Sequence, residues 1–378
     1  MRLIVSLLAI FCVVSGCSAQ GSSTPAAAAQ KPAAVETGTL EGAAFRIDVP
    51  AKWNNALVVY YHGYAATPVL LPARDPIAPQ LGQLLERGYA VAQSAYSATG
   101  WAIEQAAADT QRLRRHFSDK HGKPRETFVV GMSMGGALTA MTLETSAADY
   151  AGGLSLCGAI QPSDALLQRD FALLAAFDFY FPGLLGPLYP VPADYAPNAA
   201  AVARIAAALR AKPDAANSLL RIWGVGNLQT LPDILAFDYF EVGELQRRTR
   251  GNPFGNADLV YTGGRDDFAL NTGVHRYTAD AGAAAYLAKW YTPSGNLTRP
   301  LLALHDVGDP LVPASGAFEY ALAVQRSGHA SNFVQQFVAR EGHCVFTPQE
   351  IGRAFDELVA WVHDGKRPIS GALPGLKD

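Results

Sequence analysis

Short apolar runs alternate with helical patterns along much of the chain. The runs have strand length and are bounded by turn residues, whereas the stretch after residue 102 has apolar positions at spacings of three and four, as on one helix face. The predicted elements in chain order are strands at 45–49, 57–61 and 89–95, a helix at 103–117, a strand at 127–130, a helix from Met134 and a strand at 154–156.

This alternation stops at about residue 162 and returns near residue 300. Residues 162–296 are rich in Ala, Leu, Phe, Tyr and Pro, with helix-like stretches at 199–211 and 279–289. After them we expect a strand at 300–304, a helix at 315–326, a strand at 333–337 and a helix at 348–362. Such alternation is typical of an α/β fold, a mostly parallel sheet covered by helices on both faces. We assign residues 41–161 and 297–370 to that core and residues 162–296 to a mainly helical cap insertion.

The N-terminus has the pattern of an export signal. Arg2 precedes an apolar run at 3–14, which is too short to span a bilayer but has the length of a signal-peptide hydrophobic region. The sequence Val14-Ser15-Gly16-Cys17 resembles the bacterial lipobox, which implies that residues 1–16 are removed and that Cys17 is lipidated. Residues 17–40 are mostly small or polar and are predicted to be a disordered tether. We therefore expect a protein of the bacterial cell envelope, or a secreted one, held to a membrane by a lipid anchor.

Composition narrows the class of protein. The 378 residues are 49% hydrophobic and 17% charged, with a formal net charge of −3. These values exclude a disordered chain and a basic nucleic-acid-binding protein. A compact globular protein that does not bind nucleic acid is expected.

The sequence Gly131-Met132-Ser133-Met134-Gly135 matches the pattern G-x-S-x-G. It lies directly between a predicted strand and a predicted helix, where a sharp turn would hold Ser133 in a strained conformation with its hydroxyl exposed. The helix N-terminus would offer the N–H of Met134 to an oxyanion. A purely structural Gly-rich turn is the alternative. We predict that Ser133 is a nucleophile.

A serine nucleophile in such a turn needs an acid and then a histidine later in the chain. His343 lies in a loop between a predicted strand and a predicted helix, so it is the candidate base, with a satisfied loop histidine as the alternative. For the acid we prefer Asp309, in a turn held by two prolines, over Asp306, which is more easily a turn-stabilising residue. The second oxyanion donor is expected from the loop His62-Gly63-Tyr64, through the N–H of Tyr64.

This ordered set of motifs resembles the α/β-hydrolase superfamily, over residues 41 to 365. The loops at His62-Gly63, Cys157-Gly158 and Gly342-His343-Cys344 are similar to those of secreted bacterial serine esterases. Tannases and feruloyl esterases place Cys beside the nucleophilic Ser, whereas Ser133 has Met on both sides. The resemblance implies an α/β-hydrolase fold and a serine hydrolase, and it argues against those two substrate classes.

We predict hydrolysis of a small-molecule carboxylic ester through an acyl-enzyme on Ser133. The aromatic and apolar start of the insertion, residues 171–189, favours an apolar or aromatic acyl group, although most of it is expected to be cap core. A serine peptidase on the same fold is the alternative, with Arg or Asp residues of the cap gripping a peptide terminus. A non-catalytic envelope binding lipoprotein fits less well.

No cofactor or metal ion is predicted. The sequence has no CxxC pair, HExxH, P-loop or dinucleotide-binding glycine pattern. The neighbouring acids Asp266 and Asp267 are interpreted as part of a solvated loop.

The cysteines give a further prediction. Cys157 closes the strand after the Ser133 helix, and Cys344 follows His343, so both thiols should reach the same edge of the sheet if His343 reaches Ser133. In an oxidising compartment the two would form a disulfide. Two unrelated buried thiols are the alternative.

Overall fold

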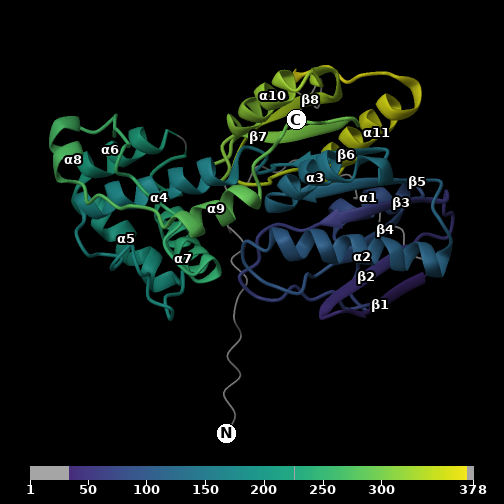
Figure 1. The fold of residues 1–378 in the computed structure, drawn as a ribbon, viewed down its shortest axis with the longest axis horizontal. Coiled ribbons are helices and arrows are strands. Elements are labelled where there is room, and N and C mark those ends of the chain that lie inside the picture. The colour runs from purple at the N-terminus through teal and green to yellow at the C-terminus, as the bar shows by residue number, and fades with distance from the viewer. Residues whose placement is uncertain (1–33, 225, 373–378) are drawn as a thin grey trace, which may run out of the picture.

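The computed structural model describes residues 34–224 and 226–372. It has a region built on one sheet and a lobe of helices that extends to one side of it (Figure 1). The predicted signal peptide and Cys17 lie outside the described residues. Within the described part, no helix combines the length and the apolar character needed to cross a bilayer.

The sheet has nine described strands in the order β1-β2-β4-β3-β5-β6-β7-β8-β9. The first two pairings, β1 with β2 and β2 with β4, are antiparallel, and the remaining pairings are parallel. The strands are β1 (Ala34–Leu40), β2 (Ala43–Val49), β3 (Ala56–Tyr61), β4 (Ala90–Ser94), β5 (Glu126–Met132), β6 (Gly152–Leu156), β7 (Leu301–Gly308), β8 (Phe333–Glu341) and β9 (Gly371–Ala372).

Helices cover both faces of this sheet. On one face α1 (Pro79–Glu86) and α11 (Pro348–Asp364) pack against one set of strand side chains. On the other face lie α2 (Ile103–His121), α3 (Met134–Thr145) and α10 (Gly316–Arg326). The side chains of the central strands alternate between the two cores, so that Phe128 and Val130 of β5 are buried on one face and Val129 on the other. The predicted α/β fold class is confirmed.

The predicted disordered tether is wrong for residues 34–40. These residues form β1, which pairs with β2 from Ala34 opposite Val49 to Leu40 opposite Ala43. The side chain of Glu36 on this strand also accepts hydrogen bonds from His116 and His121 of α2. Backbone pairing along a sheet edge does not require large apolar side chains, and composition alone therefore gave no sign of this strand.

The segment between β6 and β7 is helical. Its helices are α4 (Ser163–Tyr180), α5 (Ala199–Ala211), α6 (Pro213–Trp223), α7 (Leu231–Thr249), α8 (Asp267–Gly273) and α9 (Ala281–Lys289). Phe171 and Phe177 of α4 are buried inside this lobe, as expected for most of that aromatic run. The pair Asp266 and Asp267 begins α8, where both carboxylates accept backbone N–H groups. The acids interpreted as a solvated loop therefore start a helix.

Candidate active site

Ser133 lies at the sharp turn between β5 and α3. Its backbone has φ 58° and ψ −124°, a conformation that non-glycine residues rarely adopt. The two flanking glycines are needed for this turn: a Cβ on Gly131 would lie 2.0 Å from the carbonyl oxygen of Gly135, and a Cβ on Gly135 would lie 2.2 Å from that of Tyr61. The turn is further held by the N–H of Ser133, which donates to Leu156 O at 3.0 Å. The predicted sharp, strained turn at Ser133 is present.

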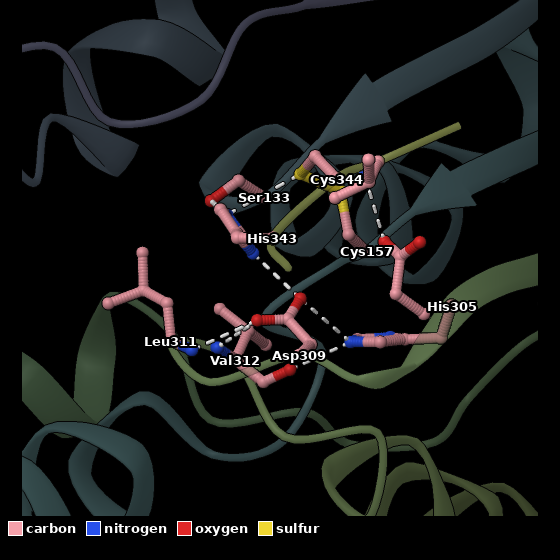
Figure 2. Close-up of a disulfide and its surroundings, with 10 residues drawn as sticks. Ser133, Cys157, His305, Asp309, Leu311, Val312, His343 and Cys344 are labelled. Carbon is pink, nitrogen blue, oxygen red and sulfur yellow. Dashed lines mark hydrogen bonds and ion pairs between the residues drawn. A yellow bond between two sulfur atoms is a disulfide. The ribbon is translucent and has the colours of Figure 1, made fainter. Parts of the chain in front are cut away.

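His343 and Asp309 meet Ser133 in one chain of hydrogen bonds (Figure 2). His343 Nε2 lies 2.8 Å from Ser133 Oγ, and His343 Nδ1 lies 2.7 Å from Asp309 Oδ2. Because the carboxylate only accepts, the proton belongs on Nδ1, which leaves Nε2 to accept from the serine hydroxyl. Such an arrangement can take a proton from a serine and return it to a leaving group.

Asp309 is fully buried and held from several sides. Its Oδ1 accepts the backbone N–H groups of Leu311 at 3.0 Å and Val312 at 2.9 Å. Burial alone would raise the pKa of this carboxyl, but hydrogen bonds from His305 and His343 outweigh it and lower the pKa below its ordinary value. Asp309 therefore stays ionised and can stabilise a positive charge on His343.

Two neighbours of this acid were not assigned to the site from the sequence. His305, at the end of β7, is buried, with Nε2 2.8 Å from Val312 O and 3.4 Å from Asp309 Oδ2 (Figure 2). Asp306 is not a local turn residue, because its carboxylate accepts the N–H of Val345 at 3.1 Å. It thereby ties the end of β7 to the loop that carries His343. Strand spacing alone does not say which way these side chains turn, so the sequence held no signal for either role.

Cys157 and Cys344 form the predicted disulfide. Their Cα atoms are 5.2 Å apart, and the bond joins residues separated by 187 positions. Cys157 follows β6 directly and is fully buried. Cys344 Sγ lies 3.4 Å from His343 Nε2, so the bridge fixes the loop beside the imidazole (Figure 2).

The loop after β3 lies against the serine, as expected for an oxyanion site. A Cβ on Gly63 would lie 3.0 Å from Ser133 Cβ and 3.6 Å from Ser133 Oγ. The next residue, Tyr64, packs its ring edge-on against Phe237 of α7, with ring centroids 5.4 Å apart. Met134 begins α3, where the first backbone N–H groups of a helix have no intrahelical partner.

His62 has a structural setting in this loop. Its ring stacks on Tyr96 at 3.8 Å between centroids, and Nδ1 lies 2.6 Å from Gly63 O. Burial lowers the pKa of His62, which keeps the imidazole neutral. These contacts give His62 a structural role in the loop.

Comparison with known proteins gives the following picture. No protein-family model matches the chain, and no curated protein matches its sequence. Among solved structures, Pyrococcus horikoshii acylaminoacyl peptidase aligns at 10% identity with a TM-score of 0.46, over 87% of this chain and 41% of that one. A Pyrococcus furiosus esterase aligns at 12% identity with a TM-score of 0.45, over 86% of this chain and 89% of that one. Candida antarctica lipase A aligns at 16% identity with a TM-score of 0.47, over 89% and 77%.

The fold class rests on the chain's own architecture. A mostly parallel sheet lies between two helix layers, and the serine turn joins a central strand to the helix behind it. This is the α/β-hydrolase fold predicted from the sequence. The chain spans about two fifths of the acylaminoacyl peptidase that it matches.

Proposed function

We propose that the protein is a serine hydrolase that cleaves carboxylic esters through an acyl-enzyme. One observation carries the proposal: Ser133 Oγ, the imidazole of His343 and the carboxylate of Asp309 form a continuous hydrogen-bonded chain. Ser133 is only half-buried, and the His343 side chain is 21% exposed, so a substrate can reach both.

The reaction proceeds in two steps. Ser133 Oγ attacks the ester carbonyl while its proton passes to His343 Nε2, and Asp309 stabilises the imidazolium. The N–H groups of Met134 and Tyr64 hold the negative oxygen. His343 then protonates the departing alcohol, which leaves the acyl group on Ser133. A water molecule, deprotonated by His343, attacks the acyl carbon and releases the acid and the free serine.

A fluorophosphonate probe tests the proposal directly. The purified protein should be labelled, labelling should vanish in Ser133→Ala, and it should persist in the control Ser146→Ala, at the end of α3. An unlabelled wild-type protein would remove every serine-hydrolase interpretation at once.

Nitrophenyl esters and aminoacyl amides then separate esterase from peptidase. We expect the esters to be cleaved faster, and the catalytic efficiency to rise from acetyl to longer or aromatic acyl groups. A higher efficiency on the amides would favour the peptidase instead.

We further propose that the mature protein is lipid-anchored at Cys17 in the bacterial cell envelope. Support comes from the lipobox-like sequence Val14–Cys17 and the tether-like residues that follow it. Incorporation of labelled palmitate into the wild type and its loss in Cys17→Ser would support the anchor. Equal labelling of both proteins would overturn it.

A further inference from the structure

Three acidic side chains are buried together where α4 and α7 of the lobe meet. Asp170 comes from α4, and Asp238 and Glu241 come from the same face of α7. One carboxylate oxygen from each lies within 4.8 Å of the others. The three residues are only 4%, 0% and 5% exposed, so water does not solvate their charges.

The protein leaves much of this charge unbalanced. Among the described residues, Arg169 is the cation that faces the group, and its guanidinium donates to Asp170 Oδ1 at 2.9 and 3.2 Å. Neither oxygen of Asp238 has a hydrogen-bond partner within the described chain. An unpaired buried carboxylate is costly. With all three acids ionised, three carboxylates and one guanidinium would leave a net charge of two negative units, and burial raises the pKa of each acid against that state.

We propose that Asp170, Asp238 and Glu241 bind one divalent metal cation, preferentially Ca²⁺. The charge of such an ion would balance the group. A point central to three oxygens with this spacing lies at most about 2.8 Å from each of them, close to the 2.3–2.6 Å of Ca²⁺–oxygen bonds. All the ligand atoms are carboxylate oxygens, which suit hard cations. The stricter octahedral geometry of Mg²⁺ fits a protein-made site of this kind less well.

The acidic group lies next to the loops of the candidate active site. Arg169 also donates to Leu311 O at 3.2 Å, in the loop whose backbone holds Asp309. Burial, and after it the charge of Glu241, raise the pKa of Tyr64, which places Glu241 near the side chain of the oxyanion loop. The bound ion would therefore fasten two lobe helices at the point where the lobe meets the active-site loops.

Titration of the metal-free protein tests the site. The protein is stripped with EDTA, desalted and titrated with CaCl₂ or MgCl₂ by calorimetry, and its thermal unfolding is followed in parallel. We expect one Ca²⁺ per chain, weaker binding of Mg²⁺, and a Tm raised by about 4 °C at a Ca²⁺ concentration a hundredfold above Kd. A wild-type protein that binds neither ion, nor Mn²⁺, and whose Tm does not respond would overturn the proposal.

Variants locate the site. Asp238→Asn should lose the Ca²⁺ heat and the Tm response, yet in EDTA it should unfold at the same or a higher temperature, because it removes a buried carboxyl that has no hydrogen-bond partner among the described residues. The matched control is Asp233→Asn, an exposed position on the same helix, which should respond as the wild type does. If Asp238→Asn does not fold, Glu241→Gln takes its place.

Two further results would contradict the proposal. Wild-type Ca²⁺ binding by the folded variant would overturn this site. A Tm that rises with methylammonium but not with metal ions would show that the group receives an organic ammonium instead.

Discussion

The sheet region and the helical lobe treat buried charge in opposite ways. At the edge of the sheet, the buried Asp309 is surrounded by two backbone N–H groups and two imidazoles. In the lobe, the equally buried Asp238 has no hydrogen-bond partner among the described residues. The first carboxyl has a lowered pKa, whereas burial, together with the charges of Asp170 and Glu241, raises the pKa of the second. Protein groups stabilise the charged form of Asp309, whereas the surroundings of Asp238 favour its neutral form.

The difference follows from how each region is built. The carboxyl ends of the parallel strands bring loops from β3, β5, β7 and β8 to one edge, where backbone groups can complete a site. Helices of the lobe meet only through side chains, because their backbone groups are already paired within each helix. A buried acid between two helices therefore finds fewer donors. The lobe instead contributes side-chain packing against the active-site loops, such as the contact of Phe237 with Tyr64.

The largest expected effect is on the complete site. Asp309→Asn keeps the size of the side chain but removes the charge that stabilises the imidazolium, so kcat should fall by about 10⁴-fold. Asp306→Asn serves as the control and should lose far less. Steady-state kinetics on a nitrophenyl ester measures both. A fall of less than tenfold for Asp309→Asn would show that another group orients His343.

The disulfide is the next contributor to the sheet region. Replacing Cys157 and Cys344 together by Ser opens a bridge across 187 residues, for which chain entropy assigns roughly 4–5 kcal/mol of unfolding free energy. The loop beside His343 would loosen as well, and a displacement of about 1 Å can cost on the order of a hundredfold in rate. Urea unfolding and kcat/KM, compared with the oxidised wild type without a reductant, measure the two effects. Unchanged urea midpoints would contradict the stabilising role.

Much of the sheet region could be predicted because its patterns are local. The spacing of Ile103, Ala106, Thr110, Leu113 and Phe117 predicts the face of α2 that the structure buries. Strand, turn and helix around Ser133 follow one another in the sequence, and chain order then restricted the acid and the base. The disulfide prediction used the same logic, since Cys344 adjoins His343.

The rest depends on contacts between distant segments. His116 and His121 of α2 form hydrogen bonds with Glu36 of β1, but no pattern in the α2 sequence predicts that a strand lies beside them. Asp170 is far in sequence from Asp238, so no spacing pattern joins them. The hydrogen bond between His305 and the carbonyl of Val312 orients the imidazole, and Val312 lies in the loop after β7, outside the strand pattern.

A smaller effect concerns stability against pH. Burial raises the pKa of Asp306 to about 6, so the folded state holds this proton more tightly than the unfolded chain does. Stability from this group is therefore full below pH 4 and falls as pH rises from about 4 to 6. In Asp306→Asn, which keeps an oxygen for Val345 N–H, that fall should be absent. Between pH 4 and pH 7 the variant should gain roughly 2–3 kcal/mol of unfolding free energy relative to wild type in urea. Parallel curves for the two proteins would contradict the assignment.

The smallest effect tests whether the lobe influences the site through packing. Phe237→Ala removes an edge-to-face contact with Tyr64, and such contacts contribute about 0.5–1.5 kcal/mol. If the N–H of Tyr64 holds the oxyanion, a looser loop should lower kcat by about three- to tenfold with little change in KM, because that hydrogen bond is strongest in the transition state. Phe179→Ala is the matched control, since this lobe ring packs on Tyr180 instead. Equal kcat values for the two variants would mean that the packing of Phe237 on Tyr64 does not affect the oxyanion loop. The rate would then depend on the sheet region and not on this contact with the lobe.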